Sequence, residues 1–424
     1  MLTGIKFLAK PSTEQKIRLS QWMGCARVIW NAKCEEDEYL RKFSVRYLPV
    51  GTYPPIDQTF SQYKTELTPW LKDCPSQILR NSAVNWYQTY QKFLKGICGR
   101  PRKKRKGDAS SIHLTREVFI LEKDAFGNFK LFIGSKTNNI GYLRVKFHTN
   151  NFSVPNSIRI RREKDRYYVS FCYEDGIDGS DLWEKEQYLK HFSQFSSAEL
   201  DEITIGIDRG IKRPVQAGDS YFDLSDNEKR KRSGREKYFK RPQRRLSKQK
   251  KGSRRRELCK TKLGKTHQRI SNIRNNFCHQ TSKRLVQGQS KILVFEDLKT
   301  KNMNRSARGT VENPGKKVRA KSGLNRNILN QAWFKLETFV EYKAHRSGKV
   351  VFKVSPHHTS QECADCGHTH PDNRVRQDLF VCTVCGNTDN ADRNASRVIK
   401  KRAINLILDS GTELSKKGVL VNSS

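Results

Sequence analysis

Three acidic residues stand where a metal-dependent reaction could use them. Asp208 ends the apolar run 203–207, and Glu296 ends the apolar run 292–295. Both runs have the length and composition of buried strands. Asp392 opens a segment whose apolar residues recur at helical spacing. Because ligands bind at the carboxyl ends of strands in α/β sheets, we expect these three side chains to meet at one sheet edge.

A cluster of carboxylates is suited to chemistry with divalent metal ions. Mg²⁺ prefers oxygen ligands and keeps positions open for phosphate oxygens and water. Two such ions about 3.5–4 Å apart can hold the attacking and leaving oxygens of a phosphodiester. The plain alternative is that each acid caps a helix or pairs with an arginine. Three acids in strand, strand and helix contexts favour the metal site.

Four cysteines form two CxxCG motifs that are separated by fifteen residues. This spacing is typical of a tetrahedral zinc ribbon. The glycine after each motif permits the tight turn that points backbone amides at the thiolates. We therefore predict one structural zinc ion, held by Cys363, Cys366, Cys382 and Cys385. The other cysteines show no framework spacing, which indicates reduced thiols in a cytosol.

The charge of the chain predicts a polyanionic partner. Its 424 residues include 83 Lys and Arg against 43 Asp and Glu, a formal net charge of +40. Such a chain repels itself when compact unless a polyanion neutralises it, and nucleic acid is the polyanion we expect. A membrane surface is the alternative, but no long amphipathic terminus stands out. We find neither a signal-peptide core nor an apolar run of spanning length.

The order of these motifs resembles that of TnpB proteins, which are RNA-guided nucleases of insertion-sequence transposons and relatives of compact type V CRISPR effectors. A looser similarity covers residues 6–31 and 69–96, so the resemblance extends over nearly the whole chain. The residues that carry it most specifically are GIDRG at 206–210, FEDL at 295–298, TSQECADCG at 359–367, CTVCG at 382–386 and DRNA at 392–395.

The resemblance implies a function and a set of partners. It maps Asp208, Glu296 and Asp392 onto a RuvC-type catalytic triad that holds Mg²⁺, and it maps the four cysteines onto the zinc site. It also implies a bound guide RNA, a double-stranded DNA target and a prokaryotic cytoplasm, with nucleoid association when the protein is on DNA. Arg209 departs from the family pattern, which usually has an apolar residue there. Monomer and dimer both stay open.

Strand-like and helical patterns divide the chain into a multidomain α+β fold. By resemblance, we expect an N-terminal β-barrel (wedge) with an inserted helical recognition domain, followed by an RNase H-like (RuvC) α/β nuclease domain with an inserted zinc ribbon. The expected bounds are 1–10 and 97–175 for the barrel, 11–96 for the helical domain, 176–202 for a linker, 203–361 and 387–410 for the nuclease domain, 362–386 for the zinc ribbon and 411–424 for a tail.

Two strongly basic stretches are candidate nucleic-acid contacts. Residues 99–107 hold six cations among nine residues, and residues 229–269 hold twenty cations with two acids. A solvated loop and a highly soluble helix are the plain alternatives. Such an excess of positive over negative charge instead favours contact with nucleic-acid phosphates. The candidate residues are Arg100, Arg102, Lys103, Lys104, Arg244, Arg245, Arg254 and Arg255.

These patterns and the resemblance together predict an RNA-guided DNA endonuclease. A guide RNA would pair with one target strand while the protein reads a short flanking motif and cuts by metal-dependent hydrolysis. A compact type V CRISPR effector would share this chemistry. A nuclease-dead guided repressor is kept open by Arg209. An actin-like ATPase also has a Gly-Ile-Asp-x-Gly loop, but residues 211–213 lack its small hydroxyl side chains and a zinc ribbon has no place in that fold.

Overall fold

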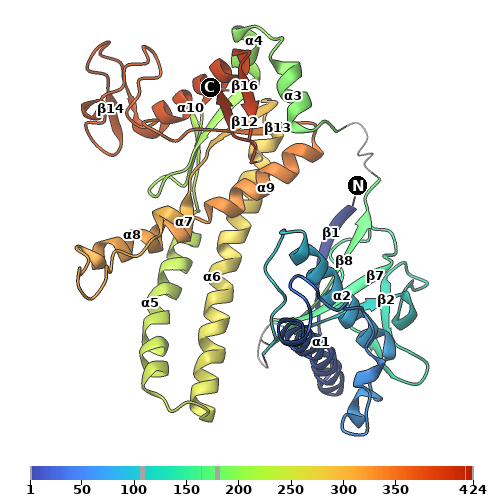
Figure 1. Cartoon of the computed structure of the whole chain (residues 1–424). Coiled ribbons are helices and arrows are strands. Elements are labelled where there is room, and N and C mark those ends of the chain that lie inside the picture. The colour runs from blue at the N-terminus through green and yellow to red at the C-terminus, as the bar shows by residue number, and fades with distance from the viewer. Residues whose placement is uncertain (1, 106–109, 164, 177–181, 416, 423–424) are drawn as a thin grey trace. The chain divides into compact units, whose positions relative to one another are not determined.

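The computed structural model describes residues 2–105, 110–163, 165–176, 182–415 and 417–422. The chain forms two compact units, Met1–Asp178 and Gly179–Ser424, and each is considered by itself (Figure 1). Outside the described residues lie positions 1, 106–109 and 164 of the expected barrel, which include the end of the first basic stretch. Positions 177–181 of the expected linker and 416 and 423–424 of the expected tail also lie outside.

The first unit opens with a strand and a long helix, as predicted. Strand β1 (Leu2–Ala9) leads into α1 (Thr13–Tyr47), where Ser12 and Gln15 form a capping box that satisfies the first free amides. The 3₁₀ turns Ser61–Tyr63 and Pro69–Leu71 lead to α2 (Ser76–Leu94). Both helices contribute to one apolar core with the strands. Trp22 lies in this core and Trp86 and Tyr90 lie in a second, smaller one, whereas the aromatic residues near the end of α1 are exposed.

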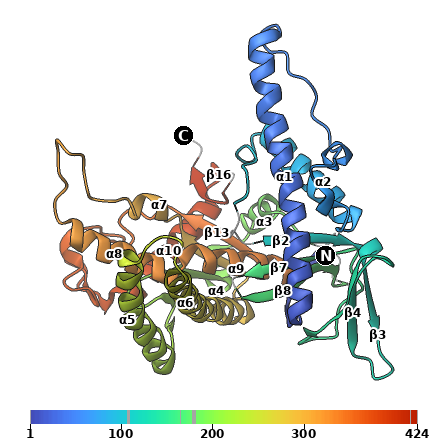
Figure 2. The same ribbon diagram turned by 90° about the horizontal axis from the view of Figure 1, so that it is seen from below.

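The strands of the first unit form two sheets around a common apolar core. One sheet has the order β2-β7-β8-β1-β6, and the other has the order β3-β4-β5, with β3 and β4 side by side in Figure 2. The chain crosses between the sheets at the 3₁₀ turn Arg116–Val118 and again at Arg144. The expected barrel thus takes the form of two separately hydrogen-bonded sheets. The remaining strands are β2 (Ser110–Thr115), β3 (Phe119–Lys123), β4 (Phe129–Gly134), β5 (Asn139–Leu143), β6 (Val145–Lys146), β7 (Ser157–Glu163) and β8 (Arg166–Glu174).

The second unit is built on a five-stranded sheet of order β11-β10-β9-β12-β13. Strands β9, β12 and β13 run parallel, while β10 and β11 are antiparallel additions at one edge. The bounds are β9 (Thr204–Asp208), β10 (Val215–Ala217), β11 (Ser220–Phe222), β12 (Ile292–Glu296) and β13 (Val350–Val354). Both runs predicted to be buried strands are strands that end at their acids.

Helices cover both faces of this sheet. On one face, α10 (Ala391–Leu408) packs with the even-numbered residues Ile292 and Val294 of β12. On the other face, α6 (Arg254–Gln287) and α9 (Trp333–Arg346) pack with the odd-numbered residues Leu293 and Phe295. Alternate residues of each strand therefore belong to different cores.

Two expected segments at the borders of the expected nuclease domain are corrected by the structure. The later part of the expected linker folds as α3 (Lys185–Phe192) and α4 (Ser197–Ile203), and the expected tail forms a hairpin of β16 (Thr412–Leu414) and β17 (Leu420–Asn422). Tyr188, Phe192, Leu200 and Leu420 are buried in the core under α10. These segments belong to the second unit because their apolar side chains complete that core.

The second basic stretch forms a long helical hairpin. Helices α5 (Asp226–Lys248) and α6 lie side by side in both views (Figures 1 and 2). Beyond β12 follow α7 (Thr300–Met303) and α8 (Val318–Gln331), and the cysteine segment carries the small strands β14 (Leu379–Val381) and β15 (Thr388–Asn390). Among the described helices, none is both long and apolar enough to cross a membrane.

Candidate active site

The parallel pairing of β9 and β12 brings the first two acids to the same sheet edge. Ile207 is the register partner of Phe295, so Asp208 and Glu296 follow at the ends of neighbouring strands. Strand alternation places both on the face that α10 covers, because Ile207 and Phe295 lie in the opposite core.

The third acid reaches this edge because α10 approaches β9 closely. A Cβ on Gly206 would lie 2.1 Å from the backbone oxygen of Ser396, so only glycine permits this packing. The Ser396 hydroxyl donates to the Gly206 carbonyl at 2.8 Å. Asp392 lies one turn earlier in the helix, where Asn390 caps it by accepting from the Asp392 amide at 3.2 Å.

Burial raises the pKa of all three acids, and at Asp208 the charges of the other two acids raise it further. The pKa of Asp208 is raised to about 7, first by burial and then by the negative charges of Glu296 and Asp392. Burial also raises the pKa of Asp392, against the opposing effect of nearby Arg374 and Arg213. The structure therefore brings the three predicted acids together, and their hard oxygen donors suit a divalent cation.

Glu296 is held in place by a neighbouring hydroxyl. Its pKa is raised by burial, while a hydrogen bond donated by the Thr359 hydroxyl to its Oε1 opposes the rise. Within the described part of the chain, the four cysteines alone form a metal-suited group with all ligand atoms within 4.8 Å. At least one pair of the three carboxylates is therefore more widely spaced than the cysteine ligands.

The raised pKa of Asp208, caused first by burial and then by the neighbouring acids, predicts a pH-dependent loss of stability in the metal-free protein. Asp208 keeps its proton up to about pH 7 when folded but loses it near pH 4 when unfolded. The folded state thus binds more protons, and the free energy of unfolding falls as pH rises from about 4 to about 7. At pH 8, Asp208→Asn should raise the melting temperature by about 2–4 °C for each kcal/mol that the ionised carboxylate costs the folded state. At pH 4 the melting temperature should stay unchanged.

Calorimetry with a chelator present checks this prediction. Asp201→Asn is the matched control, since Asp201 is 59% exposed and its carboxylate pairs with Lys400. A melting temperature of Asp208→Asn that equals the parent's at pH 8 would show that neither burial nor the neighbouring acids destabilise the ionised Asp208 carboxylate.

Arg209, the departure from the family pattern, faces away from the carboxylates. It follows Asp208 and so points to the α9 face, where its guanidinium pairs with Glu337 at 2.6 Å. The departure therefore leaves all three acids in place at their edge.

The four cysteines form a cluster that fits a tetrahedral metal. The Sγ atoms of Cys363 and Cys385 are 3.7 Å apart, and those of Cys366 and Cys382 are 3.5 Å apart. Thiolates about 2.3 Å from a shared zinc ion would be separated by similar distances. Backbone amides lower the pKa of Cys382 to about 6, with the Cys385 amide as the largest cause. The predicted ligands are thus assembled as a metal site requires.

The cysteine cluster is tied directly to α10. Asn394, one turn or less from Asp392, accepts from the Ala364 amide at 3.0 Å and donates to the Glu362 carbonyl at 2.7 Å. Arg374, which lies between the two cysteine motifs, reaches within 3.9 Å of Asp392. The fold of the cysteine segment and the position of the third acid are therefore linked.

The candidate nucleic-acid residues fall into two different settings. Arg100 pairs with Asp37 of α1 at 2.8 Å, and Lys103 pairs with Glu35 at 3.1 Å, so part of the first stretch is bound to α1. The Trp30 indole also donates to the Arg102 carbonyl at 2.9 Å. The four candidates of the second stretch are exposed and gather at the turn of the hairpin, and they are Arg244, Arg245, Arg254 and Arg255.

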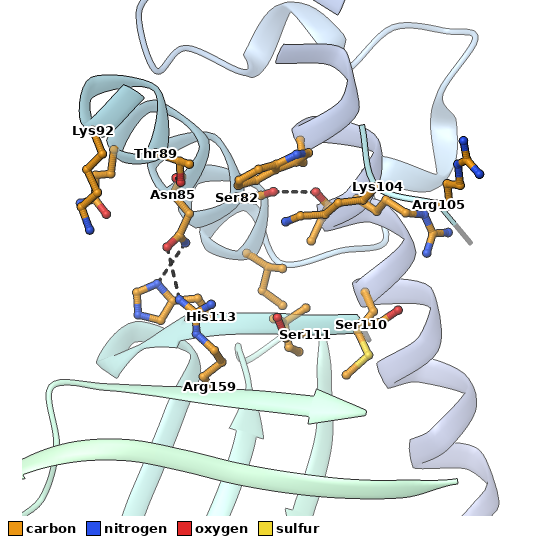
Figure 3. Close-up of a pocket in the computed structure, with 17 residues that line it drawn as sticks. Ser82, Asn85, Thr89, Lys92, Lys104, Arg105, Ser110, Ser111, His113 and Arg159 are labelled. Carbon is orange, nitrogen blue, oxygen red and sulfur yellow. Dashed lines mark hydrogen bonds between the residues drawn. The ribbon is translucent and has the colours of Figure 1, made fainter. Parts of the chain in front are cut away.

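Sequence patterns missed a polar cleft of about 510 Å³ in the first unit. Figure 3 shows Asn85 of α2 directed toward His113 of β2 and Arg159 of β7. Arg159 donates to Asn85 Oδ1 at 3.3 Å, and Asn85 Nδ2 lies 3.3 Å from His113 Nδ1. Lys92 and Lys104 also line the cleft. Four segments far apart in sequence build this cleft, so no local motif could have revealed it. Of the predicted nucleic-acid contacts, Lys104 lies in the cleft.

Three family models match parts of the chain. "Cas12f1-like, TNB domain" matches residues 333–399, which include the cysteines and Asp392. "Probable transposase" matches residues 187–307, which include Asp208 and Glu296. "Helix-turn-helix domain" matches residues 1–34, which fold here as β1 and the first part of α1.

Near full-length relatives carry related names. A protein of Escherichia coli (strain K12) named "Putative RNA-guided DNA endonuclease InsQ" is 29% identical over 399 residues, covering 94% of this chain and 91% of the relative. A "Putative RNA-guided DNA endonuclease" of Streptomyces pristinaespiralis is 25% identical over 401 residues, covering 93% and 87%.

Solved structures with similar chain traces include a Cas12f1-sgRNA-target DNA complex, with a TM-score of 0.33, 15% identity and coverage of 95% of this chain and 100% of that one. The mini-RNA-guided endonuclease CRISPR-Cas_phi3 gives a TM-score of 0.48, 11% identity and coverage of 95% and 92%. The sequence matches confirm the resemblance that the motifs predict: the chain is similar to transposase and Cas12f1-like family models and to proteins named RNA-guided DNA endonucleases.

Proposed function

We propose that this protein is an RNA-guided DNA endonuclease that cuts by metal-dependent hydrolysis. The observation that carries the proposal is the convergence of Asp208, Glu296 and Asp392 at one buried sheet edge. The names of the near full-length relatives point to the same activity. The strand order β11-β10-β9-β12-β13, with Asp208 and Glu296 at the ends of two parallel strands, supports the assignment of this domain as RNase H-like (RuvC).

In this proposal, the three acids hold two Mg²⁺ ions. Bound Mg²⁺ would supply positive charge at the scissile phosphate and lower the pKa of the attacking water. Thr359 orients Glu296 by its hydrogen bond to Oε1. Arg213 donates to the Asn390 side chain at 3.1 Å, beside Asp392. Arg213 thus places a positive charge next to the acids, where a DNA phosphate would enter.

The four cysteines would hold one structural zinc ion, which fixes the segment that carries Arg374. The segment's own apolar core contains few residues: Cys363, Phe380, Cys382 and Ala391. So small a core does not stabilise a fold by itself. Zinc binding would therefore supply the stability that keeps Arg374 and the start of α10 in register with the acids.

The hairpin of α5 and α6 is the proposed holder of the guide RNA and its DNA partner strand. Its exposed arginines at the turn lie on a helical arm with few acids to neutralise them. A duplex held by its backbone needs such sequence-independent charge.

The cleft of the first unit is the proposed reader of the flanking motif. It combines an amide, Asn85, with the cations Lys92 and Arg159. Asparagine can make paired hydrogen bonds with adenine, while a lysine on phosphate carries no sequence information. Asn85→Ala should lower discrimination between flanking sequences by about tenfold. Lys92→Ala should weaken binding to all sequences alike and reduce the salt slope by about one.

Binding of guide-loaded protein to targets with randomised flanks measures both effects. Arg80→Ala is the control, because Arg80 pairs with Glu117 outside the cleft at 2.6 Å. Unchanged discrimination in Asn85→Ala would exclude this residue as the reader.

A reconstituted cutting assay tests the proposed function. Protein loaded with a chosen guide should cut a plasmid carrying the complementary sequence beside the correct flank, and only with Mg²⁺ present. A protein that binds this target and leaves it uncut would be the nuclease-dead repressor. A compact type V CRISPR effector would cut equally, and the origin of its guide would distinguish it.

A further inference from the structure

Arg209 is a buried cation immediately next to the first acid. Its side chain is 1% exposed, and strand alternation turns it to the face opposite Asp208. A buried guanidinium needs partners for its charge and its donors.

The partners of Arg209 lie on two other elements of the second unit, α9 and β12, and a third element, β13, is linked through one of them. One nitrogen pairs with Glu337 Oε2 of α9 at 2.6 Å, and another donates to the backbone carbonyl of Glu296. Lys353 of β13 binds the second oxygen of Glu337 at 2.6 Å. The side chains of Arg209, Glu337 and Lys353, here called the buried charge group, thus join the ends of β9, β12 and β13 to α9.

The contact with Glu296 extends the link between the two acid-bearing strands. The backbone register of β9 and β12 ends at the pair Ile207 and Phe295, one residue before the acids. Beyond that point, the guanidinium of Arg209 bridges from the residue after Asp208 to the carbonyl of Glu296 itself. Arg209 therefore adds a side-chain link between the two strands at the level of the acids.

Stability alone does not account for a charge group at this place. Burying ions costs desolvation, and apolar replacements of similar volume are often as stable or more so. Large apolar clusters flank the strands on both sides, so apolar replacements would meet apolar neighbours. A planar two-armed guanidinium, in contrast, fixes the geometry of two partners at once.

We infer that the buried charge group is a positioning device that sets the spacing of Asp208 and Glu296 for metal binding, with Arg209 as its central member. The inference rests on the proposed function of these acids. The three side chains of the group pair with one another at α9, on the face of the sheet opposite Asp208 and Glu296. They act through the backbone of β9 and β12.

Four variants of the full-length protein test this inference. Arg209→Met removes both hydrogen-bonding nitrogens. Arg209→Lys keeps a positive charge for Glu337 but cannot also donate to the Glu296 carbonyl. The combined variant Arg209→Met, Glu337→Met and Lys353→Met removes the whole buried charge group. Lys185→Met is the matched control, since Lys185 pairs with Glu341 of α9 in the same unit and belongs to no proposed site.

Two readouts are measured for each variant. One is the rise in melting temperature that millimolar Mn²⁺ produces in the protein freed of nucleic acid. The other is the Mg²⁺ concentration that gives half-maximal guided cutting. Arg209→Met and Arg209→Lys should lose most of the Mn²⁺ response and need about tenfold more Mg²⁺, as when a residue that orients a metal ligand is lost. The control should match the parent in both.

The combined variant separates positioning from stability. We expect its melting temperature without metal to return close to the parent's, while its Mn²⁺ response stays low. A combined variant or an Arg209→Lys variant with the parent's Mn²⁺ response would overturn the inference. Asp208→Asn serves as the reference. If it responds to Mn²⁺ like the parent, the proposed metal site is wrong. If Asp208→Asn loses the Mn²⁺ response while Arg209→Lys keeps it, the metal site stands and only the inference about Arg209 is wrong.

Discussion

Asp208→Ala is expected to lower guided cutting by at least about a thousandfold, while binding of guide RNA and target DNA stays at the parent's level. Asp208 lies at the centre of the acid cluster, since its pKa responds to both Glu296 and Asp392. Without it, the remaining acids cannot hold two ions at the spacing that phosphodiester hydrolysis needs. The fold should survive, because the change relieves repulsion in a buried site.

Gel-shift and cutting assays on the same preparation measure both halves of this expectation. Glu296→Ala should behave in the same way. Asp201→Ala, at an exposed position of the second unit, should cut normally. An Asp208→Ala protein that still cuts would remove Asp208, Glu296 and Asp392 as the catalytic group.

Cys382→Ser is expected to lose the bound zinc and to lower cutting by about a hundredfold. The segment between the cysteine motifs has too small an apolar core to fold without the metal. Its loss would release Arg374 from Asp392 and break the support that Asn394 receives from Ala364. Guide-RNA binding should change much less, because the exposed arginines of the hairpin lie on other elements.

Metal analysis of the purified protein, together with cutting assays, checks this second prediction. Parent protein should carry one zinc per chain, and Cys382→Ser should carry none. Cys98→Ser, at an exposed cysteine of the first unit, should keep both zinc and cutting. Full cutting by a zinc-free Cys382→Ser protein would show that the cysteine segment does not support the acids.

Features encoded by local residue patterns could be predicted from the sequence. The strands that end at Asp208 and Glu296 follow from short apolar runs, and the start of α1 follows from Ser12 and its neighbours. The cysteine cluster follows from motif spacing alone. In each of these cases, neighbouring residues carry the whole signal.

Features that depend on packing between distant segments could not be predicted in this way. The cleft around Asn85 needs α2, β2 and β7 to meet, and no single segment signals it. The expected linker is acidic, polar and aromatic in sequence, and its aromatic residues Tyr188 and Phe192, at helical spacing, fill the core. Strand alternation after Asp208 could have placed Arg209 on the opposite face, but its partner Glu337 lies 128 residues further along the chain.

The first basic stretch shows why charge runs are weak predictors of contact residues. Its six cations appeared equivalent in sequence, but α1 supplies Asp37 and Glu35 as partners for Arg100 and Lys103. Lys104 instead lies 3.4 Å from the centre of the Trp30 ring and lines the cleft. The acids that neutralise such a run are far away in sequence and appear only in the fold.

The RNA that accompanies the protein tests the central claim most directly. The gene would be expressed with its native flanking DNA, the protein purified, and the bound RNA sequenced. We predict one enriched RNA, copied from DNA beside the gene, whose end segment directs cutting of a complementary target. Repeat-derived RNAs with many different spacers would instead indicate a CRISPR effector. Absence of any enriched RNA would contradict the claim that this protein is RNA-guided.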